Sequence, residues 1–182
     1  MIDCVGGLLV LVNGLPGSGK TTLGASLARS LNAWFLSKDA VKEALAGSLE
    51  NVSDLPELGG IAMDAVWALA ARSPAAVVID SWWFKPRDLA FARAGIERVG
   101  ARHTVEVWCN LPSEVARSRY AGRQRAAIYR DQQRLVENWD HWAAHAAPLG
   151  LAPTLLVDTT RTVDPAVLAQ RIQAITDSSA EH

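Results

Sequence analysis

Cysteine is scarce in this sequence of 182 residues, which contains only Cys4 and Cys109. Two cysteines build no disulfide framework, and neither has a second cysteine or a histidine at metal-ligand spacing. We therefore expect reduced thiols and a cytoplasmic protein. No apolar run approaches the ~18 residues that span a membrane, and the N-terminus lacks a signal-peptide pattern, so we expect no membrane partner.

Lysine is also scarce, and positive charge is balanced. The 18 basic residues face 19 acidic ones, only four of the basic residues are lysines, and six of the 14 arginines lie between Arg117 and Arg134. A chain of net charge −1 is not held to nucleic acid by bulk charge, so a nucleic-acid partner is not expected. Its length and 49% hydrophobic content suit one folded domain over residues 1–182.

Short apolar runs alternate with longer helical patterns along the chain. Leu8–Asn13 is apolar almost throughout, which is typical of a strand buried on both faces. Further strands are predicted at 34–37, 76–80, 104–109 and 154–158, and helical patterns at 20–31, 39–46, 58–71, 86–99, 112–147 and from 164 onward. This alternation predicts an α/β fold with three layers, in which a five-stranded parallel sheet binds ligands at its carboxyl edge.

Residues 14–21 match the phosphate-binding pattern G-x-x-x-x-G-K-[ST] at every fixed position, with a predicted strand before them and a helix after them. The backbone N–H groups of such a loop bind a polyphosphate, the lysine reaches its β- and γ-phosphates, and the threonine hydroxyl binds Mg²⁺. We therefore predict ATP and Mg²⁺ as ligands. The predicted nucleotide-binding residues are Gly14, Leu15, Pro16, Gly17, Ser18, Gly19, Lys20, Thr21 and Thr22.

Two aspartates follow predicted strands. Asp80 closes the strand at 76–80, where a carboxylate beside the phosphate site can hold Mg²⁺ together with Thr21; the alternative is a cap for the next segment. Asp39 follows the strand at 34–37, where a carboxylate can take the proton of an acceptor hydroxyl. It is equally a preferred N-cap for the next helix, and the two roles are compatible. Lys38 and Lys42 flank Asp39 as anion-binding candidates or as solvated lysines.

The arginine-rich stretch is predicted to form a lid over about residues 117–134. Arginines match phosphate oxygens in a bidentate manner and stabilise charge during phosphoryl transfer. Gly122 offers a point at which the backbone can bend. Arg119 and Arg123 are the predicted catalytic arginines, alongside Lys20 and Asp39, whereas Arg130 and Arg134 are interpreted as helix surface. The alternative for the whole stretch is a solvated helix face.

Aromatic residues follow Asp80 directly. Trp82 and Trp83 lie past the strand end, where rings can line an acceptor pocket; the alternatives are packing on a helix and a dimer contact, and the oligomeric state stays open. Lys38, Trp82, Trp83 and Arg87 are the predicted substrate-binding residues. His141 and His145 have the spacing of a helical metal pair, but without a third ligand we interpret them as packing residues.

These features resemble the small P-loop kinases, and most closely the group that includes chloramphenicol phosphotransferase, zeta-toxin kinases and the kinase domain of polynucleotide kinase. The resemblance rests on residues 14–21, Asp39, Asp80 and the arginines after the fourth strand. It implies strand order 2-3-1-4-5, Asp39 as base, a mobile arginine lid and an adenine contact in residues 158–161. The substrate motifs of shikimate and gluconate kinases and a nucleoside-monophosphate signature are absent.

The leading hypothesis is an ATP- and Mg²⁺-dependent kinase for a hydroxyl of a small metabolite or antibiotic-like acceptor. A polynucleotide 5′-hydroxyl kinase uses the same chemistry and is the first alternative, which the net charge disfavours. The second alternative is a regulatory P-loop NTPase that hydrolyses nucleotide without an acceptor. The candidate base Asp39 and the lack of a guanine-recognition motif disfavour that reading.

Overall fold

A computed structural model describes residues 7–50, 57–123, 129 and 131–178 of the chain. Its centre is a five-stranded sheet in the order β2-β3-β1-β4-β5, and all neighbouring strands pair in parallel. This order confirms the expectation from the resemblance. The strands are β1 (Leu8–Asn13), β2 (Trp34–Ser37), β3 (Val77–Asp80), β4 (His103–Asn110) and β5 (Thr154–Asp158).

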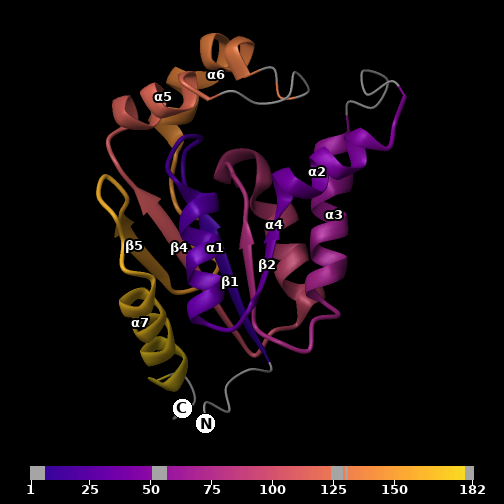
Figure 1. Cartoon of the computed structure of the whole chain (residues 1–182), viewed down its shortest axis with the longest axis vertical. Coiled ribbons are helices and arrows are strands. Elements are labelled where there is room, and N and C mark those ends of the chain that lie inside the picture. The colour runs from indigo at the N-terminus through magenta and orange to yellow at the C-terminus, as the bar shows by residue number, and fades with distance from the viewer. Residues whose placement is uncertain (1–6, 51–56, 124–128, 130, 179–182) are drawn as a thin grey trace.

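Helices cover both faces of the sheet (Figure 1). On one face α1 (Lys20–Ser30) and α7 (Pro165–Ser178) pack on Val10, Val12 and their neighbours, and on the other α3 (Leu58–Ala70) and α4 (Lys85–Val99) pack on Leu9 and Leu11. Helix α2 (Lys38–Gly47) packs against α3. The alternating sides of β1 therefore serve two cores, which explains its unbroken apolar sequence.

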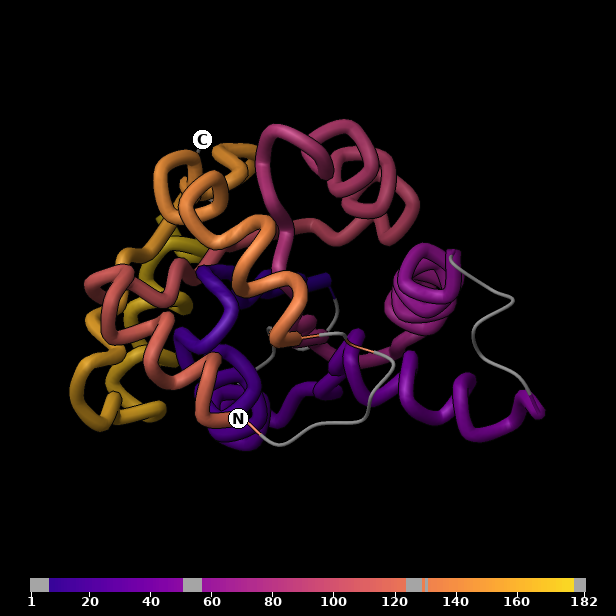
Figure 2. The backbone as a smooth tube through the Cα atoms, turned by 90° about the horizontal axis from the view of Figure 1, so that it is seen from above, coloured from indigo at the N-terminus to yellow at the C-terminus, as the bar shows by residue number. Residues whose placement is uncertain are grey.

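Helices α5 (Ser113–Ala121) and α6 (Asp131–His145) lie across the carboxyl edge of the sheet (Figures 1 and 2). A third apolar cluster joins them to the loop after β1 and includes Leu15, Tyr120 and Trp139. The helical pattern predicted over 112–147 contains two helices, and α5 ends at Ala121, directly before Gly122, where we expected the backbone to bend. The Tyr120 hydroxyl donates to Asp131 at 2.7 Å and links the two helices.

Cys4 and part of the predicted lid, residues 124–128 and Arg130, lie outside the described part of the chain. Within the described residues, no helix has the length and apolar content needed to span a membrane.

A buried polar network joins three segments beneath the carboxyl edge. Glu106 of β4 is only 1% exposed, and its carboxyl group accepts hydrogen bonds from Asn13 Nδ2 at 3.0 Å and from the backbone N–H groups of Leu149 (3.0 Å) and Gly150 (3.3 Å). Asn13 Oδ1 in turn accepts from the N–H groups of Gly14 (2.8 Å) and Trp83 (3.1 Å). Together these bonds fix where the loops after β1 and β3 begin.

We predict that Glu106→Leu destabilises the protein by about 3 kcal/mol. Leucine has a similar size but accepts no hydrogen bond, and each buried donor left without a partner costs about 1–3 kcal/mol. Urea denaturation of the wild type and the variant measures the difference. Glu97→Leu, at an exposed position of α4, is the matched control and is expected to change stability by about 0.5 kcal/mol or less. A loss below about 1 kcal/mol for Glu106→Leu would contradict the structural role of the network.

Candidate active site

The loop between β1 and α1 has the backbone of a phosphate cradle. Gly14, Gly17 and Gly19 have φ values of 144°, 88° and 87°, in the region that favours glycine. A side chain at Gly17 would collide with the Ala116 carbonyl oxygen, so α5 packs directly against the loop. Helix α1 follows with no side-chain cap and no acidic residue in its first turn. Its N-terminal N–H groups are therefore oriented for an anion, which fits the phosphates of ATP.

Lys20 folds back into this loop. Its Nζ donates to the carbonyl oxygens of Gly14 and Leu15, both at 2.9 Å, and the side chain is buried. Burial lowers the pKa of the Lys20 amine to about 8, and Asp80 and Cys109 offset only part of this effect. A polyphosphate in the loop would provide the negative charge that favours the protonated amine.

Asp80 faces Lys20 from the end of β3 and is 4% exposed. Burial raises the pKa of its carboxyl group, whereas hydrogen bonds from the side chains of Thr21 and Ser37 lower it. Mg²⁺ prefers oxygen ligands and is usually held by one or two carboxylates together with phosphates and water. Thr21 and Asp80 fit that donor set. No group of three or more His, Cys, Asp or Glu side chains suited to a metal occurs among the described residues.

Asp39 lies in the first turn of α2, and Ser37, not Asp39, is the N-cap residue. The alternative of a plain N-cap role for Asp39 is therefore wrong. Its side chain is 44% exposed and lies 3.8 Å from Lys38 Nζ. Asp39 lines a cavity of about 100 Å³, here called the central cavity, together with Lys20, Thr21 and Asp80. The structure thus brings the predicted base and the predicted phosphate and metal ligands to one place.

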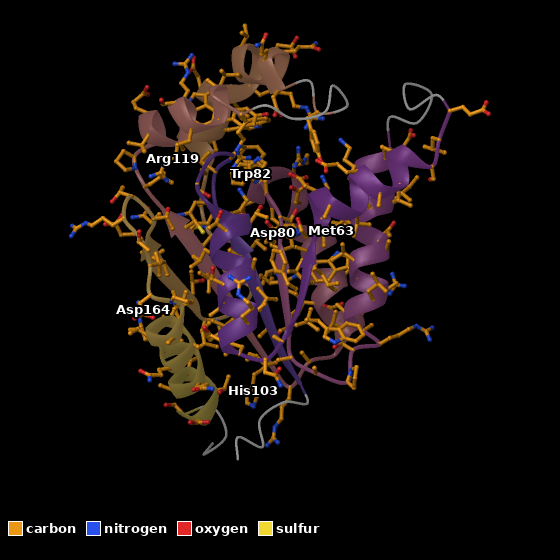
Figure 3. All side chains as sticks on the ribbon, viewed as in Figure 1. Met63, Asp80, Trp82, His103, Arg119 and Asp164 are labelled. Carbon is orange, nitrogen blue, oxygen red and sulfur yellow. The ribbon has the colours of Figure 1, made fainter. Side chains whose placement is uncertain are left out.

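A second cavity of about 350 Å³ adjoins the central cavity, and we name it the acceptor cavity. Trp82, Lys38 and Arg87 line both cavities, so they mark the boundary between them. Figure 3 shows Asp80 and Trp82 toward the upper end of the sheet and Met63 to one side of them, with His103 near the opposite end of the sheet. Met63 lines the far side of the acceptor cavity.

The two tryptophans after Asp80 have different environments. Trp83 is 2% exposed and stacks on Trp67 of α3 with ring centroids 6.0 Å apart, so its ring belongs mainly to the core although it borders the acceptor cavity. Trp82 is partly exposed and packs against Phe84 (5.7 Å) and Trp142 (6.4 Å). Trp82 is thus the tryptophan better placed to contact a ligand.

The predicted catalytic arginines face different cavities. Arg123 lines the central cavity. Arg119 donates to the carbonyl oxygens of Thr159 (3.0 Å) and Thr160 (3.4 Å) and lines a third cavity of about 380 Å³. Thr22 and residues 159–163 also line that cavity, so it extends from the phosphate loop toward the loop after β5.

Arg134 is exposed on α6, as expected of a helix surface. It also lines both the central and the acceptor cavity, which the sequence analysis did not predict. Spacing along one helix could not reveal this, because α6 reaches the cavities only by crossing the edge of the sheet. Lys85, which follows the same strand as Arg87, has its Nζ close to Gly150 and lines none of the three cavities.

Tyr129 is a site residue that sequence reasoning missed. It is buried, lines the central cavity, and its hydroxyl lies 3.0 Å from both the Asp39 carbonyl oxygen and Glu43 Oε1. Lys42 Nζ lies 4.6 Å from the centre of its ring. Tyr129 thus connects the segment between α5 and α6 to the helix that carries Asp39. A lone tyrosine between arginines offers no sequence signal for this contact.

Comparison with known proteins identifies relatives of this fold. Residues 9–149 match the AAA_33 family model, described as an AAA domain. A Chloroflexus aurantiacus protein provisionally assigned as a kinase is 23% identical, with a TM-score of 0.71 over 96% of this chain and 98% of its own. Shikimate kinase from Acinetobacter baumannii, in complex with shikimate, is 21% identical, with a TM-score of 0.57 over 96% of this chain and 94% of its own. The tunicamycin resistance protein of Deinococcus radiodurans is 16% identical, with a TM-score of 0.56 over 93% of this chain and 95% of its own.

These likenesses show the fold, an α/β P-loop kinase fold, at identities too low to transfer a substrate. A search of the curated proteins finds no match to this sequence.

Proposed function

The chain belongs to the AAA_33 family of AAA domains, and on that basis we propose that it is an ATP- and Mg²⁺-dependent phosphotransferase acting on a hydroxyl group of a small molecule. The observation that carries the proposal is the central cavity, where Asp39 shares one space with Lys20, Thr21 and Asp80. A P-loop protein that only hydrolyses nucleotide needs no second cavity beside this space. Here the acceptor cavity adjoins it and shares Lys38, Trp82 and Arg87 with it.

The proposed roles follow from where each group lies. When bound, ATP supplies the phosphoryl group and Mg²⁺ supplies positive charge beside its phosphates. The loop N–H groups and Lys20 bind the phosphates, and Thr21 and Asp80 hold the metal. Asp39 orients the acceptor hydroxyl and takes its proton. Arg123, in the central cavity, stabilises negative charge on the transferred group.

The third cavity is the proposed site for the nucleoside. It begins at Gly19 and Thr22, beside the phosphate loop, and ends at the loop after β5. Arg119 closes one side of it and is held by two backbone carbonyl groups of that loop. This arrangement separates the two proposed arginine roles: Arg119 positions the nucleotide, and Arg123 faces the reaction.

The test is a screen for ATP consumption that depends on an acceptor. Purified protein with ATP and Mg²⁺ is mixed with pools of hydroxylated metabolites and antibiotics, ADP is measured in a coupled assay, and products are identified by mass spectrometry. We expect ADP formation to require one pool, to yield a phosphorylated acceptor, and to stop when EDTA removes the metal.

Two outcomes would contradict this proposal. ATP hydrolysis that proceeds equally without any acceptor would indicate a regulatory NTPase. Salt-dependent transfer to the 5′-hydroxyl of an oligonucleotide, without transfer to small acceptors, would indicate a polynucleotide kinase.

A further inference from the structure

The acceptor cavity is lined by more positive than negative side chains. Its lining includes four cationic residues, Lys38, Lys42, Arg87 and Arg134, and one carboxylate, Asp88. They come from three different helices, because the lysines lie on α2, Arg87 on α4 and Arg134 on α6. Cations that converge from separate elements create a positive potential inside the cavity, and this potential favours an anionic ligand.

The cations are close enough to repel one another. Burial lowers the pKa of the Lys38 amine. Asp39, whose carboxylate lies 3.8 Å from this amine, and Asp88 offset part of the effect, whereas Arg134 and Arg87 lower the pKa further. A fold that holds like charges together in a partly buried place loses stability unless an anion compensates. The repulsion around Lys38 therefore agrees with a binding site for negative charge.

The nucleotide phosphates have cations of their own. Lys20 and Arg123 line the central cavity and not the acceptor cavity, and Arg119 lines the third cavity. The four cations of the acceptor cavity approach from α2, α4 and α6, and none of them lies in the loop that cradles the phosphates. All four also line the central cavity, so Lys38, Arg87 and Arg134 can face the acceptor as well as the transferred group.

Asp88 offsets only one of these four positive charges. Its carboxylate binds Arg87 through Nε and Nη2, both at 2.7 Å, and also accepts from the Phe84 N–H at 2.8 Å. These bonds anchor the Arg87 side chain to the start of α4. A guanidinium has five N–H donors, so the pairing with Asp88 leaves donors for a ligand.

Apolar side chains also line the acceptor cavity. Met63 of α3, Phe91 of α4 and the rings of Trp82 and Trp83 line it. Aromatic rings bind the faces of planar or apolar groups, and a volume of about 350 Å³ is that of a small-molecule site. Charge and apolar surface thus lie in one cavity, which suits a ligand with both features.

We propose that the acceptor is a hydroxy compound with an oxyanion, a carboxylate or a phosphate, which Arg87, Arg134 and Lys38 bind while Trp82 and Met63 contact its apolar body. The inference rests on the proposed phosphotransferase function and specifies its substrate class. The acceptor hydroxyl then points toward Asp39 in the central cavity, because the cations lie at the boundary of the two cavities.

Binding without ATP tests the anion site apart from catalysis. The probes are 4-(hydroxymethyl)benzoate, its methyl ester and 4-(hydroxymethyl)phenyl phosphate, titrated by calorimetry and tryptophan fluorescence. We expect at least one anion to bind at least 10-fold more tightly than the ester, and the better anion distinguishes a carboxylate site from a phosphate site. Equal affinities, or no binding of any probe at millimolar concentration, overturn the proposal.

Variants then assign the binding to these residues. Arg134→Gln and Arg87→Gln are each expected to weaken anion binding about 10-fold and leave ester binding unchanged, whereas Arg134→Lys keeps the charge and most of the affinity. Arg98→Gln, an exposed position on α4, is the matched control and is expected to have no effect. Anion binding that withstands both glutamine variants overturns the assignment.

A turnover screen with acid and ester pairs separates this inference from the proposed function. Transfer to hydroxy acids and not to their esters supports both. Preferential binding of anions with no transfer to any acceptor supports the anion site and contradicts the phosphotransferase. Transfer to neutral acceptors alone supports the phosphotransferase and overturns the anionic acceptor.

Discussion

Asp39→Asn is expected to lower kcat by about 10²–10⁴-fold while ATP affinity changes less than about 3-fold. Asparagine keeps the size of the side chain but cannot accept the proton of the acceptor hydroxyl. Asp39 is partly exposed and lines the central cavity, so the exchange should leave the fold intact. Turnover with the acceptor found by the screen, together with ATP binding by calorimetry, measures the two effects.

The control for this experiment is Asp177→Asn, an exposed position near the end of α7. It makes the same chemical change away from the carboxyl edge of the sheet and should retain full activity. If Asp39→Asn also stays within a few-fold of wild-type turnover, Asp39 is not the base.

Lys20→Met is the second variant with a large expected effect, a loss of about 10²–10³-fold in kcat together with weaker ATP binding. Methionine is an unbranched side chain of similar length that can occupy the buried position, but it has no charge for the phosphates. We expect the variant to be at least as stable as the wild type, because burial in the fold disfavours the protonated amine, as its lowered pKa of about 8 shows. Calorimetric ATP binding, turnover and thermal denaturation test the three statements.

Lys85→Met is the matched control for Lys20→Met. Lys85 is also a lysine after a strand, but its amine lies close to Gly150 and outside the three cavities. It should keep both ATP binding and turnover. Loss of stability without loss of ATP affinity in Lys20→Met would assign that lysine a structural role.

Local patterns were sufficient for much of the fold. The apolar run of β1, the glycine-rich loop and the start of α1 are adjacent in the chain, so their geometry follows from short-range constraints. Strand-end positions for Asp39 and Asp80 followed from alternating strands and helices. The strand order needed the resemblance to known kinases, because several orders satisfy the same alternation.

Residues that act across the fold escaped the sequence analysis. Glu106 reads as one charged residue in a strand, yet it joins the loops after β1 and β3 to the segment before β5. Arg134 and Tyr129 reach the site only through the path of the chain over the sheet edge. For Trp83, the sequence left open a pocket ring, packing on a helix and a dimer contact, and its stacking on Trp67 of α3 places the ring mainly in the core.

The amino-acid sequence by itself determined the phosphate loop, the parallel α/β architecture and the strand-end placement of two aspartates, because each depends on contiguous residues. The sequence predicted Lys38 and Arg87 as substrate-binding residues, but only the tertiary structure decided that Arg134 joins them at one cavity. Lys38, Arg87 and Arg134 belong to three helices far apart in the chain, and they meet because α2, α4 and α6 converge at the carboxyl edge. The near-neutral net charge is a sum over the whole chain, so it does not reveal that positive side chains are concentrated at one cavity.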